Sequence, residues 1–173
     1  MTKSEWFDFK KRWQTPVTIK KLSDIDIGRI AAFIDGEGCI GLIKTVHPNN
    51  QYDLYTPHIE VINTNKYLCN WLVKITGIGC SRSKGNRRNT KHKMAYIWRL
   101  AVDEMIPLLT IIGPHLLLKN RQAVLLIDYL KLPRKCGGYN RFIPDEVVQQ
   151  REIIYQELKE LNQRGPQEAE RAL

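Results

Sequence analysis

Apolar positions change their spacing along the chain, and each spacing predicts a type of element. In several segments they recur every three or four residues, which is typical of one face of a helix. In others, β-branched, aromatic and polar residues alternate loosely, which favours strands. The predicted helices cover residues 25–35, 66–75, 103–112, 114–132 and 144–162, and the predicted strands 39–46, 52–62, 80–84 and 95–102.

Polar residues and prolines mark the ends and weak points of these elements. Ser23 or Asp24 is the candidate N-cap of the first helix, and Thr64 or Asn65 that of the second. Two prolines lie inside predicted elements. The first, residue 57, predicts an edge or a bulge in its strand, and the second, residue 107, predicts a split helix.

The order α-β-β-α-β-β-α-α, followed by a terminal helix, predicts an α+β fold. Two hairpins form one antiparallel sheet, with the helices packed on one face and the other face open. We divide the chain into a basic aromatic N-terminal arm at 1–22, a core domain at 23–143, and a C-terminal helix and tail at 144–173.

Composition is that of a folded, basic protein. The 173 residues are 43% hydrophobic and 26% charged, with 27 Lys and Arg against 18 Asp and Glu, so the net charge is +9. Apolar runs are too short for a membrane span, and the N-terminus has no secretory pattern. The four cysteines show no C-x-x-C spacing. We therefore expect a reducing compartment, either the cytoplasm or an organelle matrix or stroma, with no secretion and no membrane partner.

The positive charge is concentrated. Residues 61–102 contain nine basic residues and no acidic one, whereas the segment from 145 onward holds seven acidic and four basic residues. An acid-free basic stretch that covers a hairpin favours binding to nucleic acid, because releasing counterions from a phosphate backbone drives association. The alternative is an ordinary solvated surface.

The segment 27–38 carries the candidate chemistry. Gly28 and Ala32 lie four residues apart on one helix face, with Ala31 and Asp35 beside them, so that another helix can approach closely. Glu37 falls at the C-terminal end of this helix, where the helix dipole disfavours a carboxylate. This placement suggests a bound cation, most simply Mg²⁺. An acidic turn after a buried helix is the alternative.

Residues 30–38 resemble the nine-residue signature of the LAGLIDADG homing endonucleases, in the variant that ends F-x-D-G-[DE]-G. The likeness extends over residues 25–132, since the family core is also α-β-β-α-β-β-α with an antiparallel, saddle-shaped sheet. Only one copy of the motif is present, which resembles the homodimeric class. The chain departs from the common pattern at Ile30, Ala32 and Glu37.

This resemblance implies a site-specific endonuclease that hydrolyses phosphodiester bonds in double-stranded DNA. Gly28, Ala31, Ala32 and Asp35 would line the dimer contact on the two-fold axis. The Glu37 carboxylate and the Gly36 carbonyl would bind Mg²⁺. Mn²⁺ would substitute for it, and Ca²⁺ would bind without supporting cleavage.

The resemblance also assigns supporting residues. Lys119 is similar to a basic active-site residue, although a lysine that snorkels from an apolar helix is the alternative, and Arg121 is a second candidate for this role. Asn63 resembles a polar position that orients solvent near the metals, and an Asx-turn or helix cap is equally compatible with it.

Base and phosphate contacts are expected from the sheet and its loops, where alternate side chains reach the groove. The candidate DNA-binding residues are Lys44, Tyr52, Tyr55, Arg82, Lys84, Arg87, Arg88, Lys91, Lys93, Arg134, Lys135 and Arg141.

Two other classes of function remain open. An RNA maturase that binds intron RNA, or a regulator that kept the fold and lost catalysis, would share the basic surface and the motif. A structural RNA-binding protein, such as a ribosomal one, would explain the charge but not the arrangement of Gly28, Ala32 and Glu37.

Overall fold

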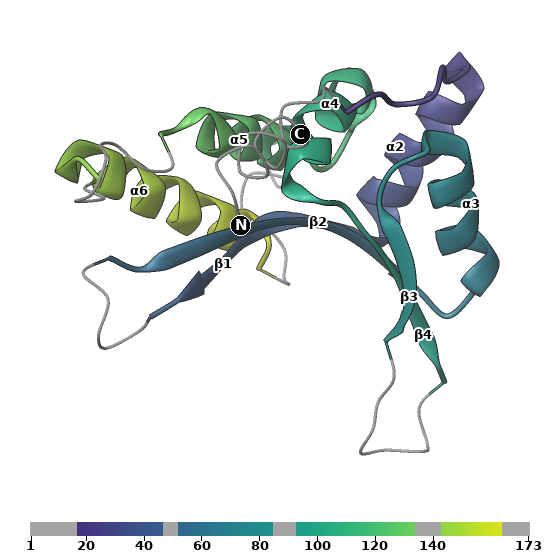
Figure 1. Ribbon diagram of the computed structural model, residues 1–173, viewed down its shortest axis with the longest axis horizontal. Helices are drawn as coiled ribbons and strands as arrows, with labels where there is room; N and C mark the ends of the chain where they lie inside the picture. Colours follow the sequence, from purple (N-terminus) through teal and green to yellow (C-terminus); the bar gives the residue numbers. More distant parts are fainter. Residues whose placement is uncertain (1–16, 47–51, 85–92, 134–142, 164–173) are drawn as a thin grey trace, which may run out of the picture.

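A computed structural model describes residues 17–46, 52–84, 93–133 and 143–163. Its α+β architecture confirms the predicted fold class and element order (Figure 1). The elements in chain order are α2 (Asp24–Glu37), β1 (Gly38–Thr45), β2 (Leu54–Asn63), α3 (Lys66–Thr76), β3 (Cys80–Lys84), β4 (Ala95–Arg99), α4 (Val102–Ile112), η1 (Gly113–His115), α5 (Asn120–Lys131) and α6 (Asp145–Leu161).

The four strands form one antiparallel sheet in the order β1-β2-β4-β3. The sheet is arched, and the helices lie together on one side of it (Figure 1). β1 pairs with β2 from Gly38↔Val61 to Thr45↔Leu54, whereas β4 pairs only with the last four residues of β2. Pro57 therefore lies where β2 has a single neighbour, in agreement with the predicted edge position.

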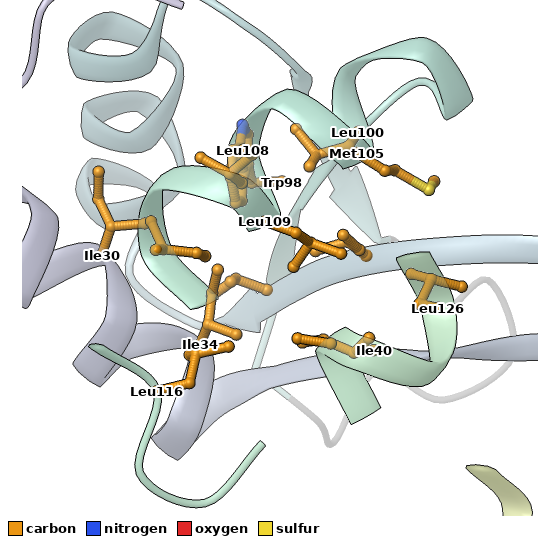
Figure 2. Packing of buried hydrophobic residues seen from close by; sticks show 14 of the residues in the cluster. Ile30, Ile34, Ile40, Trp98, Leu100, Met105, Leu108, Leu109, Leu116 and Leu126 are labelled. Carbon is orange, nitrogen blue, oxygen red and sulfur yellow. The ribbon is translucent and has the colours of Figure 1, made fainter. Parts of the chain in front are cut away.

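The core fills the space between the sheet and the helices (Figure 2). Ile30 and Ile34 of α2, Ile40 of β1, Trp98 of β4 and Leu108 of α4 are among its fully buried side chains. Apolar side chains from β1, β2 and β4 and from α2, α3, α4, α5 and α6 are thus buried in a single cluster. This burial supplies the main driving force for folding.

α2 begins where the sequence predicted and ends later. Ser23 is the N-cap, and its hydroxyl accepts a hydrogen bond of 3.2 Å from the Asp26 N–H. At the other end the helix continues to Glu37, and the Gly38 N–H donates to the Ile34 carbonyl. A Cβ on residue 38 would lie 2.6 Å from that carbonyl oxygen, so only glycine allows the helix to turn directly into β1.

Pro107 does not split α4, which corrects the prediction for residues 103–112. Proline removes one hydrogen bond of the helix. Met105, Leu108, Leu109 and Ile112, which flank it, are all buried in the core. Packing of this apolar face therefore outweighs the cost of the proline.

The predicted helix over 114–132 is also corrected. A 3₁₀ turn at Gly113–His115 is followed by a non-helical segment at 116–119, which we call the α5 entry loop, and α5 begins only at Asn120. An acceptor outside the segment takes the amides of this loop, as described below. A side chain of α5 also closes the turn, since Asn120 Nδ2 donates to the Gly113 carbonyl over 2.8 Å.

The two ends of the described chain pack onto the same body. Val17, Ile19 and Leu22 of the predicted arm pack against the core, and Lys20 donates from its backbone N–H to the Thr76 carbonyl over 3.0 Å. Near the other end, Asn162 Nδ2 donates to the Ile40 carbonyl of β1 over 2.9 Å. Within the described residues, no helix has the length and apolarity to cross a bilayer.

Candidate functional site

The C-terminal end of α2 presents an unpartnered carboxylate. Glu37 is the last residue of α2, and both it and Gly36 are exposed. Among the described residues, none donates a hydrogen bond or forms an ion pair with the Glu37 carboxylate. The close approach of Gly38 to Ile34 fixes the backbone immediately after it. The backbone that carries this carboxylate is therefore fixed, and the carboxylate itself is free to bind a ligand.

Asp35, two residues before Glu37, binds the α5 entry loop. Its carboxylate accepts hydrogen bonds from the backbone N–H groups of Leu117 (2.8 Å), Leu118 (3.2 Å) and Lys119 (3.0 Å). Three donors on one carboxylate make a strong, charge-assisted attachment. This attachment explains why residues 116–119 are not helical, and it directs the Asp35 side chain toward its own chain.

Lys119 lies beside the end of α2. Its ammonium donates to the Asp35 carbonyl, and it is half-buried. The Lys119 ammonium therefore lies at the helix end for which the sequence predicts a bound Mg²⁺ ion. Arg121, the second candidate, is directed elsewhere and pairs with Glu157 of α6 at 2.6 Å.

Asn63 lies at the same end of the sheet. Gly38, the residue after Glu37, pairs with Val61 of β2, and Asn63 lies two residues further along β2. Its Oδ1 accepts the Asn65 N–H over 2.8 Å, which is the Asx-turn named above as an alternative. Asn65 in turn is the N-cap of α3, where it accepts the Tyr67 N–H.

The outer face of α2 carries small residues that its own chain does not require. Gly28, Ala32 and Gly36 are exposed, and a Cβ added at either glycine would meet nothing within 4 Å. Ile25 on the same face is 67% exposed. Ala31 corrects the prediction, because it is 1% exposed and its methyl group belongs to the core.

Two apolar side chains that the sequence reasoning missed lie near this face. Leu117 and Leu118 of the α5 entry loop are 90% and 67% exposed, although the loop backbone is bound to Asp35 at the end of α2. The run of leucines at 116–118 predicts a helix, and no signal in it separates the exposed members from the buried Leu116.

A cavity of about 460 Å³ opens between α2 and α3. Phe33 and Trp71 form its aromatic wall, with ring centroids 5.9 Å apart in an edge-to-face arrangement. Arg29 and Tyr67 also line it, and Tyr67 is largely exposed. The cavity extends the apolar surface beside the outer face of α2.

On the open face of the sheet, exposed basic side chains of the described residues lie on the half formed by β3 and β4. Buried Val61 and Trp98 point toward the helices, so the alternate residues of β2 and β4 point to the open face. By register, Arg82 and Lys84 of β3 share that face and are exposed, as is Lys93 just before β4. Arg87, Arg88, Lys91, Arg134, Lys135 and Arg141 lie outside the described residues.

Lys44 and Tyr55 correct the predicted list of DNA contacts. They share the face of Ile40 and Ile59, which is the helix side, and Tyr55 is buried. Lys44 Nζ pairs with Asp53 at 3.0 Å and with Glu152 of α6 at 2.7 Å. Tyr52 precedes β2 and is half-buried.

This helix-side cluster is tightly hydrogen bonded. The Tyr55 hydroxyl also donates to Glu152, and Lys44 lies 5.5 Å from the centre of the Tyr55 ring. Hydrogen bonds from Lys44 and Tyr55 lower the pKa of Glu152 to about 2, and burial with the Glu152 hydrogen bond raises the pKa of Tyr55 to about 12. The Glu152 and Asp53 carboxylates raise the pKa of Lys44. The cluster fixes α6 to the sheet.

Cys39 and His58 lie side by side on the open face, with Sγ and Nε2 3.4 Å apart. Burial raises the pKa of the Cys39 thiol, which Glu60 also raises and Lys119 lowers, and burial lowers the pKa of His58. Both residues therefore favour their neutral forms. Within the described part of the chain, no three His, Cys, Asp or Glu side chains are grouped so that they could hold one metal ion.

The chain matches no family model and no curated protein sequence. It is similar to solved structures of single-domain homing endonucleases. With the archaeal intron-encoded homing endonuclease I-Vdi141I, complexed with DNA, it shares 16% identity and a TM-score of 0.67, covering 84% of this chain and 89% of the other.

Two further structures have the same architecture. The homing endonuclease I-CvuI, in complex with the I-CreI target in the presence of Mg, gives 18% identity and a TM-score of 0.64, covering 83% of this chain and 85% of the other. With the homing endonuclease I-TnaI the chain shares 17% identity and a TM-score of 0.56, covering 83% of this chain and 92% of the other. The chain therefore has the fold of the LAGLIDADG homing endonucleases, as its sequence motif predicted.

Proposed function

We propose that this protein is a homodimeric, site-specific double-strand DNA endonuclease that requires a divalent metal ion. The observation that carries the proposal is the exposed, unpartnered Glu37 carboxylate at the end of α2, beside Lys119 and at the margin of an open sheet face. The fold supports it, since the similar structures include homing endonucleases in complex with DNA targets.

The open face would hold the duplex. Arg82 and Lys84 lie on it by register, and Lys93 is exposed at the start of β4. Basic side chains on an arched sheet suit both phosphates and the acceptor-rich edge of guanine. The face of β1 and β2 near Gly41 and Thr56 is less charged, so this half would depend more on shape and neutral contacts.

The residues at the end of α2 fit a hard cation such as Mg²⁺. The Glu37 carboxylate and the Gly36 carbonyl supply oxygen ligands, which Mg²⁺ prefers. Mg²⁺ takes about six oxygens, so the proposal assigns the remainder to a second copy of Glu37, the DNA phosphates and water. When bound, the ion lowers the pKa of a coordinated water and stabilises negative charge on the phosphate.

The remaining side chains would orient the substrate. The Lys119 ammonium, held near the end of α2 by the α5 entry loop, would donate to the scissile phosphate and stabilise the charge that develops there. The Asn63 amide would orient solvent at the same end of the sheet. Asp35 acts through Lys119 and is a positioning residue, because its carboxylate holds the loop backbone.

A second copy would cover the outer face of α2. Gly28, Ala32 and Gly36 allow two helices to approach closely, and the exposed Ile25 lies on the same face. Leu117 and Leu118 add exposed apolar surface near the end of the helix. Burying such side chains removes apolar surface from water, which favours association by about 25 cal/mol per Å² before the entropic cost of association is subtracted.

Selection followed by cleavage tests the proposal. The full chain is incubated with a pool of random duplexes in Ca²⁺, and the bound duplexes are recovered and sequenced. We expect one two-fold-related motif, double-strand cleavage of the selected duplex on addition of Mg²⁺ or Mn²⁺, and no cleavage in Ca²⁺ or EDTA. Sedimentation is expected to give a dimer.

The same selection, run beside a binding assay with structured RNA, separates the alternatives. Selection of a DNA motif without cleavage in Mg²⁺ or Mn²⁺ would indicate a regulator that has lost catalysis. Tighter binding to a structured RNA than to any duplex would indicate a maturase or a structural RNA-binding protein, and a strict monomer would favour the structural protein.

A further inference from the structure

An arginine–glutamate pair crosses the middle of the open face. Glu60 of β2 and Arg99 of β4 are direct strand partners, and Cys39 and Cys80 continue the same row onto β1 and β3. Their chain neighbours Ile59, Val61, Trp98 and Leu100 are buried on the helix side. Glu60 and Arg99 therefore project to the open face, in the row that includes Cys39, two residues after Glu37.

The contact is directional. Arg99 Nε donates to Glu60 Oε2 over 2.9 Å, and Nη2 donates to the same oxygen. Glu60 thus accepts from the side-on edge of the guanidinium, and of its five N–H groups those on the end-on edge stay available. The Arg99 side chain is 44% exposed, whereas that of Glu60 is 12% exposed. The carboxylate lies beneath, and the guanidinium is presented to solvent.

We propose that Arg99, fixed by Glu60, is a base-reading residue that recognises guanine in the major groove close to the centre of the DNA site. This inference rests on the proposed function, since it needs a duplex on the open face. Guanine O6 and N7 match two parallel N–H donors, and Arg is the residue that most often supplies them.

The paired carboxylate favours a base contact over a phosphate contact. Glu60 offsets the positive charge of Arg99, so attraction to the phosphate backbone is weaker than for the exposed Arg82 or Lys84. It also removes rotamer freedom from Arg99 before DNA binds, which lowers the entropic cost of an oriented contact. The Arg99 guanidinium is fixed and carries little net charge together with Glu60. It therefore binds most strongly to two hydrogen-bond acceptors of defined geometry, such as guanine O6 and N7.

Motif selection with variants tests this inference. The full chain and its variants are bound to random duplexes in Ca²⁺, and the preference at every position is measured. We expect the wild type to prefer guanine at one symmetry-related pair of positions near the centre. Arg99→Gln should lose that preference by about 5- to 150-fold, the range that a good bidentate contact is worth. All other positions should keep their preferences.

Three further variants separate the possible roles. Glu60→Gln should weaken the same preference and increase binding to unselected duplexes, because the charge of Arg99 is no longer offset. Arg99→Lys keeps the charge but lacks the fork, so it should also lose the guanine preference. Glu157→Gln breaks a second Arg–Glu pair of the described residues, Arg121–Glu157, which lies on the helix side at 2.6 Å, and should leave the motif unchanged.

The outcomes are distinct. A wild-type motif that persists in Arg99→Gln and Arg99→Lys would overturn the inference alone and leave the pair as a link between β2 and β4, visible as lost thermal stability. A wild type with no sequence preference would overturn both the inference and the proposed function. If Arg99→Gln fails to fold, Arg99→Lys and Glu60→Gln decide the question.

Discussion

Two polar clusters of this protein use the same chemical groups in opposite ways. The first, at the end of α2, contains Asp35, Glu37 and Lys119. The second joins the sheet to α6 and centres on Lys44 and Glu152. In the α6 cluster Glu152 accepts hydrogen bonds from Lys44, Tyr55 and Gln156.

In the α2 cluster, by contrast, one carboxylate accepts several hydrogen bonds and the other accepts none from the described residues. Asp35 takes three backbone amides, and Glu37 receives no donor among the described residues. Charged groups whose hydrogen bonds are all satisfied within the chain stabilise the fold. An exposed charge without a partner, carried by a fixed backbone, is available to bind a ligand. The comparison predicts that charge removal in the first cluster will reduce activity, whereas charge removal in the second will change stability alone.

The largest effect is expected for Glu37→Gln. The change preserves shape and removes the charge that would bind the metal ion, so cleavage of the selected duplex should fall about 100-fold or more. The thermal unfolding midpoint should not fall and should rise slightly, because no described residue pairs with Glu37 and the helix dipole disfavours its charge. Single-turnover cleavage in Mg²⁺ and a circular dichroism melt measure the two quantities.

Glu152→Gln is the matched control for that variant, since it removes the same charge from the α6 cluster. Full cleavage by Glu37→Gln, or loss of cleavage by a folded Glu152→Gln, would reverse the assignment of the two clusters.

Lys119→Met should have the next largest effect. It keeps the aliphatic stem and removes the ammonium, so cleavage should fall by about 10- to 100-fold. The loss of the hydrogen bond to the Asp35 carbonyl should cost about 1 kcal/mol of unfolding free energy. Lys44→Met, the same change in the α6 cluster, should destabilise the fold and leave the cleavage rate constant intact. Equal cleavage rates for the two variants would contradict this prediction.

Asp35→Asn tests the link between α2 and the α5 entry loop. An amide accepts the Leu117, Leu118 and Lys119 donors less strongly than a carboxylate, so urea unfolding should show a loss of about 2 kcal/mol. Cleavage should also decrease, because Lys119 is positioned by the same loop. Unchanged stability would mean that the loop does not depend on these hydrogen bonds.

The smallest effect is expected for Glu152→Gln. The Glu152 side chain is 35% exposed, and solvent screens its ion pair, so we expect a loss of about 1 kcal/mol at neutral pH. The pKa of Glu152 falls from its ordinary value of 4.5 to about 2 in the folded chain. Its contribution to stability is therefore complete above pH 4.5 and is lost as the pH falls toward 2.

Urea unfolding at a series of pH values checks this sign. The difference between wild type and Glu152→Gln should be largest near neutral pH and should close in acid. A difference that grows on acidification would contradict the lowered pKa.

Local signals made much of the fold predictable from the sequence. The Ser23 and Asn65 caps, the glycine breaks and the apolar spacing lie within a few residues of the elements that they define. The motif around Glu37 likewise ends a helix with local residues. These features depend on interactions between residues close together in the chain, which can be predicted from a single sequence.

The errors came from long-range choices. The α5 entry loop is non-helical because Asp35, more than 80 residues away in sequence, takes its amides. Lys44 and Tyr55 were assigned to the wrong face because β1 has apolar or small residues at both parities, among them Ile40, Leu42 and Ile43. Which parity faces the core is set by pairing and by α6, and neither is written in the strand itself.

The contact between Asn162 and Ile40 also limits strand-to-strand association at the β1 edge of the sheet. β1 is an outer strand of the sheet, and a bare outer strand exposes a row of main-chain groups that can recruit a strand from another molecule. The Asn162 amide takes one of those acceptors, and Leu158 is buried in the core at the same end of α6. Through these contacts the terminal helix hinders strand addition at β1 and the aggregation that would follow from it.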